Sequence, residues 1–242
     1  MSQVSPLLCF RPRPQARVRL VAFPWAGSSA AGLRPLADAL FHADPGIELH
    51  AVAYAARGHR RHVPLPATLD ALADDVVPAI LGLAAPVALY GHSFGAVAAF
   101  SCAQRMCERR APPVHLVAAA RVAPSVDVRG PLLDDDALVA LLAAHGLVDP
   151  ALFADTEARA LLLPPLRRDL RLSEQTLTTD VVEIPLTTLR GLADGSVDPA
   201  GVAAWGEHGS KGCRHLTVDG GHLFVRDQAA AVAALLAQVL SP

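Results

Sequence analysis

The stretch "LYGHSFGAVAAF", residues 89–100, places Ser93 between two glycines that each stand two positions away. A short apolar run, "PVALYG" (86–91), precedes the serine and is typical of a strand buried on both faces. The apolar residues of "AVAAFSCAQRM" (96–106) recur at helical spacing. A strand, a sharp turn and a helix in this order predict a nucleophile elbow, in which a strained backbone exposes the serine hydroxyl and only glycines fit on either side. The alternative is a small structural serine in a buried turn.

Elsewhere the chain alternates between apolar runs and helical patterns. Such alternation is typical of strand-helix-strand units, which build a mostly parallel sheet covered by helices on both faces. Functional side chains are then expected at the carboxyl ends of the strands. The six runs interpreted as strands are residues 18–23, 47–54, 86–91, 114–121, 184–191 and 214–221.

The segment between Pro124 and Glu183 contains no strand-like run and is rich in leucine at helical spacing. We expect one domain over residues 1–242, with a helical lid insertion at about 128–180 that lies over the active edge of the sheet. Ordinary crossover helices are the alternative interpretation. Helix breaks inside this segment are expected at Gly146, Pro150, Pro164 and Pro165.

The overall composition argues against several classes of protein. The chain has 242 residues and a formal net charge of −2, unlike a nucleic-acid-binding protein with a strongly basic surface. Its four cysteines have neither metal-ligand spacing nor the density of a secreted disulfide scaffold, and its ten histidines form no H-E-x-x-H pattern. No run has the length of a membrane span or the form of a signal peptide. We therefore expect a cytoplasmic protein with free thiols, no metal, and no nucleic-acid or membrane partner.

A serine nucleophile needs a histidine base and a carboxylate that orients this base. In an α/β-hydrolase fold, the acid and then the base follow the serine along the chain. His222, in "VDGGHLFV" (218–225), comes just after the last expected strand in a glycine-flanked loop and is the candidate base. Asp194 lies near the end of the preceding strand and is the favoured acid. Asp198 stays open as an alternative, although with Pro199 after it this residue also fits the N-cap of a following helix.

An oxyanion hole in this fold uses two backbone N–H groups, one from the residue after the nucleophile and one from the loop after an early strand. Phe94 follows Ser93 and supplies the first. The second is expected from "FPWAGSSA" (23–30), with Ala26 as the candidate donor. Trp25 in the same loop is interpreted as a packing or pocket-wall residue.

Five segments, which cover nearly the whole chain, resemble the type II thioesterases, the discrete editing enzymes that accompany modular polyketide and nonribosomal peptide synthetases. The chain departs from the family pattern in the loop "AARGH" (55–59), where the family has P-G-R, and at Phe94, where the family's elbow has Met. The matching segments are the opening strand and F-P-x-A-G loop in residues 9–40, the elbow "YGHSFGA", the lid-end helix "LLPPLRRDLRLSE", the G-x-x-D segment "TLRGLADGSVDPAGVAAW" and the closing "GGHLFV".

The resemblance implies an α/β-hydrolase fold and a thioester hydrolase with a Ser-His-Asp triad. The implied substrate is an acyl group on the phosphopantetheine arm of an acyl or peptidyl carrier protein, which is also the implied partner of a monomeric enzyme without a cofactor. Since carrier proteins are generally acidic, arginines such as Arg167 and Arg168 are candidates for steering them. The site residues carried over are Ser93 as nucleophile, His222 as base, Asp194 as acid, and the backbone N–H groups of Ala26 and Phe94 as oxyanion donors.

Two other functions fit the same residues less specifically. A general carboxylesterase or an acyltransferase would use the same triad, because one triad serves many chemistries. A catalytically silent carrier-binding module would keep the fold, but the intact serine, histidine and elbow glycines argue against it. Comparing carrier-bound, CoA-bound and plain ester substrates discriminates among the enzymes, and labelling by a serine-directed phosphonate tests for the silent module.

Overall fold

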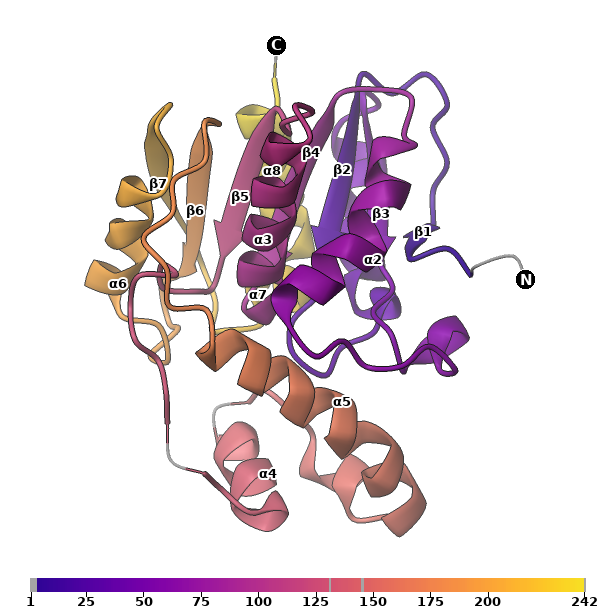
Figure 1. Ribbon diagram of the computed structural model, residues 1–242, viewed down its shortest axis with the longest axis vertical. Helices are drawn as coiled ribbons and strands as arrows, with labels where there is room; N and C mark the ends of the chain where they lie inside the picture. Colours follow the sequence, from indigo (N-terminus) through magenta and orange to yellow (C-terminus); the bar gives the residue numbers. More distant parts are fainter. Residues whose placement is uncertain (1–3, 131, 145, 242) are drawn as a thin grey trace.

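The computed structural model describes residues 4–130, 132–144 and 146–241, and a seven-stranded sheet forms its centre (Figure 1). In chain order the strands are β1 (Leu7–Cys9), β2 (Val18–Phe23), β3 (Ile47–Val52), β4 (Val87–His92), β5 (His115–Ala119), β6 (Leu186–Gly191) and β7 (Cys213–Val218). They lie side by side in the order β1-β3-β2-β4-β5-β6-β7. The β1–β3 pair is antiparallel, and the other five neighbouring pairs are parallel. The predicted mostly parallel sheet is therefore confirmed.

Helices cover both faces of this sheet (Figure 1). On one face α2 (Leu69–Leu81) and α3 (Phe94–Glu108) share a hydrophobic cluster with the central strands. On the other face α1 (Arg34–Ala43) and α8 (Ala229–Val239) share a second cluster. The shorter helices are η1 (Ala30–Leu33), η2 (Gly58–Arg60), α6 (Pro199–Ala203), η4 (Ala204–Glu207) and α7 (Phe224–Asp227).

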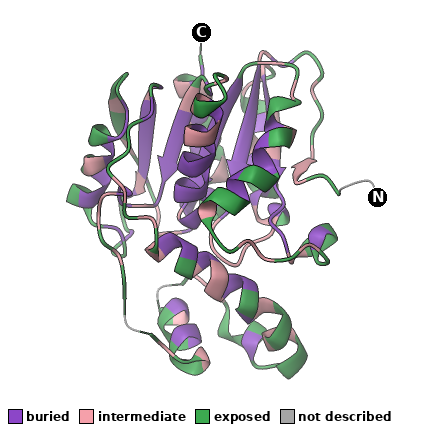
Figure 2. Ribbon diagram, viewed as in Figure 1, coloured by how far each residue is buried: buried purple, intermediate pink, exposed green. Residues whose placement is uncertain are grey.

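The central strands are buried along their whole length, between the two helical layers (Figure 2). All six residues of β2 and all six of β4 are buried, as expected for inner strands of a parallel sheet. The four alanines of α3, Ala96, Ala98, Ala99 and Ala103, are also fully buried, and their small side chains let the helix lie close to the strands. The turn that joins β4 to α3 is consequently held between two tightly packed elements.

Six of the seven strands were predicted from the sequence. β2 has the predicted bounds, and the other five predicted strands begin and end within three residues of the expected positions. The edge strand β1 was not predicted, because its three residues, which pair with β3 alone, are too short to show a periodic pattern.

Three helices lie between β5 and β6 in the sequence: α4 (Asp135–Ala144), η3 (Pro150–Phe153) and α5 (Thr156–Glu174). Together with the loops between them, these helices are called the insertion below, and the rest of the chain is called the body. The insertion lies beyond the carboxyl ends of the parallel strands (Figure 1). A small hydrophobic cluster holds its helices together, formed by Leu138, Val139, Leu142, Phe153, Leu163 and Leu166.

Two of the four helix breaks expected in this segment are present and two are wrong. Gly146 follows the end of α4, and Pro150 begins η3. Pro164 and Pro165, in contrast, lie inside α5. A proline inside a helix costs about 3 kcal/mol or more, and packing of the helix before and after the prolines offsets this cost. The packed residues are Leu163 and Leu166 in the cluster of the insertion and Leu172 in the core of the body.

The four cysteines carry free thiols, of which Cys102 is buried and the other three are partly buried. Across the described parts of the chain, we find no helix with both the length and the apolar character needed to cross a membrane. The longest helix, α5, carries charged side chains near both of its ends.

Candidate active site

Ser93 stands on the sharp turn between β4 and α3, at the carboxyl edge of the sheet. Its backbone angles, φ 55° and ψ −119°, lie in a region that residues with a side chain rarely adopt. The Ser93 N–H donates a hydrogen bond of 2.8 Å to the carbonyl of Ala119, which ends β5. The strained elbow expected from the sequence is therefore present.

The two glycines of the elbow stand where no other residue fits. A Cβ atom on Gly91 would lie 2.1 Å from the carbonyl oxygen of Gly95. A Cβ atom on Gly95 would lie 2.1 Å from the carbonyl oxygen of Phe23, at the end of β2. These contacts are with backbone atoms that cannot move aside, so the collisions expected from the sequence are confirmed.

Three side chains from distant parts of the sequence are joined by hydrogen bonds at this edge. His222 Nε2 lies 2.9 Å from Ser93 Oγ, and His222 Nδ1 lies 2.9 Å from Asp194 Oδ2. Asp194 follows β6 and His222 follows β7, so each comes from the carboxyl end of a parallel strand. When Nδ1 carries the ring proton and donates it to the carboxylate, Nε2 is left to accept the proton of the Ser93 hydroxyl. A general base needs this arrangement.

Of the two carboxylates left open by the sequence, the structure brings Asp194 to His222 and gives Asp198 another role. Asp194 is only 5% exposed. Asp198 accepts a hydrogen bond of 3.0 Å from the Gly201 N–H and caps α6, with Pro199 at the start of this helix.

Ser196 is a member of the site that sequence reasoning missed. Its hydroxyl donates to Asp194 Oδ1 over 2.6 Å and also lies 3.0 Å from His222 Nδ1, while its N–H donates to the same carboxylate oxygen over 3.0 Å. Burial by itself raises the pKa of Asp194, but the hydrogen bonds from His222 and Ser196 outweigh this effect and hold the pKa below its ordinary value. Asp194 is therefore ionised at neutral pH. The signal in the sequence was the run Asp-Gly-Ser, because an aspartate often accepts a hydrogen bond from the residue two positions on.

His92 supports the site through the backbone of His222, and this role was also not predicted. This residue is fully buried, and its Nε2–H donates to the carbonyl of His222 over 2.7 Å. Its Nδ1 accepts from the Tyr90 hydroxyl over 3.1 Å. Burial, together with the nearby His222, lowers the pKa of His92 to about 3, so the ring stays neutral. His92 thus holds the backbone of His222 without competing with it for a proton.

Both backbone groups expected to form the oxyanion hole lie in suitable local structure. Phe94 is the first residue of α3, where an N–H has no acceptor within the helix. The Ala26 N–H donates to no acceptor among the described residues. The side chain of Phe94 is buried against Tyr54, with 5.5 Å between the ring centroids, so it belongs to the core.

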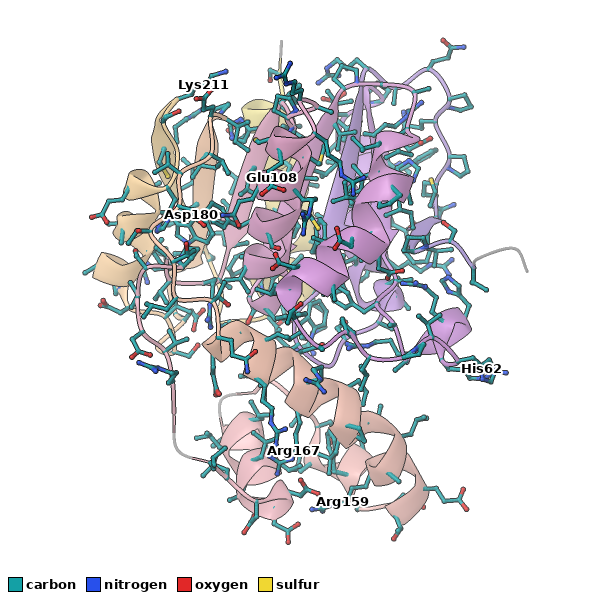
Figure 3. All side chains as sticks on the ribbon, viewed as in Figure 1. His62, Glu108, Arg159, Arg167, Asp180 and Lys211 are labelled. Carbon is teal, nitrogen blue, oxygen red and sulfur yellow. The ribbon has the colours of Figure 1, made fainter. Side chains whose placement is uncertain are left out.

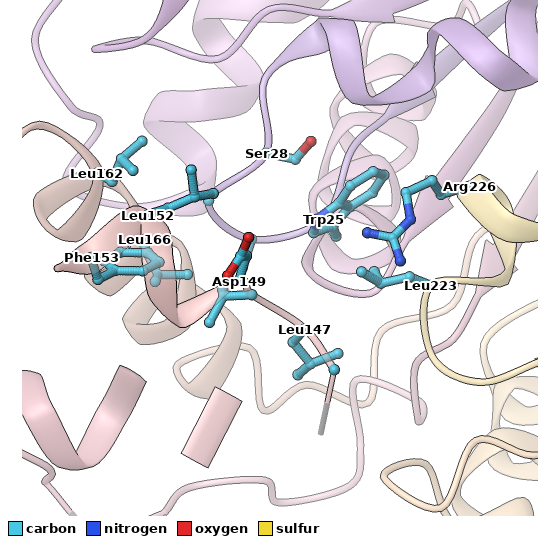
Figure 4. Close-up of a pocket in the computed structure, with 14 residues that line it drawn as sticks. Trp25, Ser28, Leu147, Asp149, Leu152, Phe153, Leu162, Leu166, Leu223 and Arg226 are labelled. Atoms are coloured by element: carbon cyan, nitrogen blue, oxygen red, sulfur yellow. The ribbon is translucent and has the colours of Figure 1, made fainter. Parts of the chain in front are cut away.

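A pocket of about 460 Å³ opens between the loop that carries Ala26 and the insertion (Figure 4). Its walls are mostly apolar, and Trp25 forms part of the wall, as expected from the sequence. The size is within the usual range for small-molecule sites. The insertion contributes Leu147, Val148, Leu152, Phe153, Leu162 and Leu166 to this lining, and the body contributes Leu223 and Arg226 from the region after His222.

Among the described residues, one group of side chains outside the site has metal-ligating atoms close together. The ligating atoms of Cys9, Glu48 and His50, on β1 and β3, all lie within 4.8 Å of one another. Glu48 is already engaged, because it accepts a hydrogen bond of 2.7 Å from His50 and pairs with Arg19 over 3.4 Å. Burial raises the pKa of the Cys9 thiol, which disfavours the thiolate that binds metals. This group is therefore better described as a hydrogen-bonded ion-pair cluster than as a metal site.

Arg167, a candidate for steering an acidic partner, is paired within the insertion. It lies on α5 (Figure 3) and forms an ion pair with Asp135 at the start of α4. A paired charge contributes little to a long-range field. The steering role of Arg168 stays a prediction.

Solved structures and curated proteins resemble this chain over most of its length. The type II thioesterase BorB from the borrelidin biosynthetic cluster shares its fold with a TM-score of 0.80 and 31% identity, covering 97% of this chain and 95% of that one. A probable cadicidin biosynthesis thioesterase of Streptomyces griseus is 33% identical over 238 residues, which are 96% of this chain and 65% of that protein. Phenyloxazoline synthase MbtB of Mycobacterium tuberculosis is 34% identical over 90% of this chain, which spans only 16% of that synthase.

The family model for the thioesterase domain matches residues 18–239. This match begins with β2 and ends with α8, so it includes the elbow, both loops that carry Asp194 and His222, and the insertion. The chain belongs to the thioesterase family.

Proposed function

We propose that this protein is a type II thioesterase, which hydrolyses acyl thioesters on the phosphopantetheine arm of acyl or peptidyl carrier proteins. The observation that carries the proposal is the hydrogen-bonded series Ser93, His222 and Asp194 on a strained elbow, in a chain of the thioesterase family. The pocket is lined by Ala26 and by Leu223, the residue after His222, and its mostly apolar walls suit an acyl chain.

In the first half of the proposed reaction, Ser93 Oγ attacks the thioester carbonyl and its proton passes to His222 Nε2. Asp194 stabilises the imidazolium that forms. The N–H groups of Ala26 and Phe94 donate hydrogen bonds to the oxyanion. When the tetrahedral intermediate collapses, the carbon–sulfur bond breaks and the pantetheine thiol leaves with the proton. A thiol with a pKa of about 8.5 is a good leaving group, so this half demands little acid catalysis.

In the second half, a water molecule attacks the acyl ester on Ser93. His222 takes a proton from the water and returns it to Ser93 Oγ, which releases a free carboxylic acid and restores the serine. The proposed reaction uses only protein groups and water, so it requires no cofactor.

In this proposal the body supplies the chemistry, and the insertion acts as a lid over the pocket. The biological role is removal of stalled or aberrant acyl groups from the carrier proteins of a polyketide or nonribosomal peptide synthetase. The free thiols of the four cysteines suit the cytoplasm, where carrier proteins are loaded.

The direct test is acyl release from a loaded carrier protein, followed by mass spectrometry of the intact carrier. Ser93→Ala should lower the rate by about 10⁴-fold or more, because a triad without its nucleophile keeps only residual catalysis. Ser101→Ala is a matched control, since Ser101 is a buried serine in α3 outside the site, and its rate should equal that of the wild type. Equal release by the wild type and Ser93→Ala would refute the proposal.

A second comparison separates the proposal from its enzyme rivals. A thioesterase should turn over the acyl carrier faster than a plain ester of the same acid, and adding an alcohol or amine acceptor should not divert the product. A preference for the plain ester would indicate a carboxylesterase, and transfer to the acceptor would indicate an acyltransferase.

A further inference from the structure

A buried ion pair joins the insertion to the body close to the site. Arg57, in the loop after β3, and Asp169, on α5, form two parallel hydrogen bonds: Nη1 to Oδ2 over 2.8 Å and Nη2 to Oδ1 over 2.9 Å. Their side chains are only 9% and 4% exposed. Burial raises the pKa of Asp169, and the hydrogen bonds from Arg57 oppose this rise.

Both partners of this ion pair also bind the backbone of the loop that carries Ala26. The N–H of Gly27, the residue after Ala26, donates to Asp169 Oδ2 over 2.9 Å. Arg57 Nη1 donates to the carbonyl of Ser28 over 2.9 Å. Two consecutive residues of the loop are therefore fixed by one ion pair, and one half of that pair belongs to the insertion.

Apolar and aromatic contacts hold the same loop. Leu166, three residues before Asp169 on α5, packs so closely on Gly27 that a Cβ atom there would lie 3.0 Å from Leu166 Cδ1. The Tyr54 hydroxyl donates to the carbonyl of Pro24 over 3.0 Å, and the Arg57 guanidinium lies 5.2 Å from the centre of the Tyr54 ring. The loop is thus held before Ala26 by Tyr54 of the body, and after Ala26 by α5 together with Arg57.

For the rate of catalysis, the position of the loop that carries Ala26 matters more than the stability of this loop. Hydrogen-bond donors stabilise an oxyanion only when they lie about 2.7–3.1 Å from it, and a misplacement of about 1 Å can lower the rate about 10²-fold. A buried charge pair is in itself weak evidence for stability, because removing two charges from water costs about as much as their attraction returns. The bonds to Gly27 and Ser28 give this pair a role that apolar residues of the same volume could not fill.

We propose that Asp169 is a positioning residue for the oxyanion hole, which it acts on through the Gly27 N–H and the adjoining Ala26. The inference rests on the proposed function, since it assumes that the Ala26 N–H faces the oxyanion. The proposal also gives the second half of α5 a role in catalysis. If this helix moved away from the body, the loop that carries Ala26 would lose its contact with Asp169.

The test compares Asp169→Asn with the wild type, using both an acyl pantetheine thioester and a p-nitrophenyl ester. We expect kcat to fall about 10- to 100-fold, with KM changed less than about twofold, because the lost contact acts in the transition state. A boronic acid that forms a tetrahedral adduct on Ser93 should bind more weakly by a similar factor. Binding of the intact thioester in the Ser93→Ala background should not change.

Asp135→Asn is the matched control. This substitution breaks the ion pair between Asp135 and Arg167, which joins α4 to α5 but does not contact the loop. Its kcat should equal that of the wild type. A loss in Asp169→Asn no larger than in this control, or a loss confined to KM, would overturn the inference.

A double variant covers the case in which Asp169→Asn fails to fold. Arg57→Met with Asp169→Leu removes both charges and leaves neither buried and unpaired, so its Tm should be near that of the wild type. Its kcat should remain low because the loop has lost its anchors, and recovery of kcat together with Tm would overturn the inference. Failure of the proposed function is distinguishable, because the wild type would then prefer the p-nitrophenyl ester to the thioester.

Discussion

The body and the insertion differ in how tightly each is packed. In the body, β2 and β4 are buried along their whole length and the elbow glycines touch backbone atoms. In the insertion, a cluster of six buried side chains holds three helices, and Leu152 and Leu161 are 56% and 65% exposed. Local stability follows the number of buried apolar contacts, so the insertion is the part that opens at lower free energy. In the proposed function, the chemistry is therefore built on the rigid region and access to it depends on the looser one.

The largest expected effect tests the body. Asp194→Asn should lower kcat by about 10⁴-fold for short and long acyl groups alike, because His222 then loses the carboxylate that sets its tautomer and stabilises its charge. Steady-state kinetics with acyl pantetheine thioesters of two chain lengths measure this loss.

Asp198→Asn is the control for that variant, since Asn caps a helix about as well as Asp. Its kcat and Tm should match those of the wild type. If Asp198→Asn were as inactive as Asp194→Asn, the assignment of the acid would be wrong.

An intermediate effect tests the insertion. Leu162 lines the pocket, and Leu162→Phe adds volume to its wall. We expect kcat/KM for an octanoyl thioester to fall about 10-fold relative to an acetyl thioester, because lost contacts of one or two methylenes are worth about 1–3 kcal/mol. Competition between the two thioesters, read by product analysis, measures the ratio.

Leu161→Phe is the matched control for the pocket variant. Leu161 is the neighbouring residue on α5, and its side chain is 65% exposed. The octanoyl-to-acetyl ratio should stay at the wild-type value. An equal change in both variants would mean that the insertion acts on chain length through its overall stability and not through the pocket wall.

The smallest expected effect concerns the loop where the two regions meet. Ala56, the residue before Arg57, has φ 61° in the left-handed region, which strains a residue with a Cβ atom. Ala56→Gly should raise the free energy of unfolding by about 0.5–1 kcal/mol, or Tm by about 2 °C, without changing kcat. Ala55→Gly should instead lower Tm, since glycine there only adds freedom to the unfolded chain. Calorimetry of both variants would contradict this account if Ala56→Gly were the less stable of the two.

The body could be predicted from the sequence because its signals are local and strong. Buried strands appear as apolar runs, and Gly91 and Gly95 mark a turn that only glycine permits. Asp194 and His222 could be placed because chain order and strand ends fix where an acid and a base must stand. The helical content of the insertion was equally clear, but Pro164 and Pro165 misled, since the packing that offsets their cost is made with other elements of the fold and leaves no local signal.

The residues that were missed act through contacts between distant segments. Asp169 is one charged residue among several on α5, and only the fold shows that its carboxylate meets Arg57 and Gly27. In the sequence His92 is one residue of the elbow motif. Its hydrogen bond to the carbonyl of His222 joins residues that are 130 positions apart. No periodic pattern records such pairings, because each depends on the path of the whole chain.

The burial of His92 also makes the stability of the fold depend on pH. An unfolded histidine has a pKa of about 6.5, whereas the folded His92 has a pKa of about 3. Between these values the unfolded chain binds one proton more at this residue, so the free energy of unfolding falls by about 1.4 kcal/mol for each unit of acidification below pH 6.5. Urea unfolding should show a loss of about 2 kcal/mol from this residue between pH 7 and pH 5. His92, which holds the backbone of His222 at neutral pH, thus lowers the free energy of unfolding in acid.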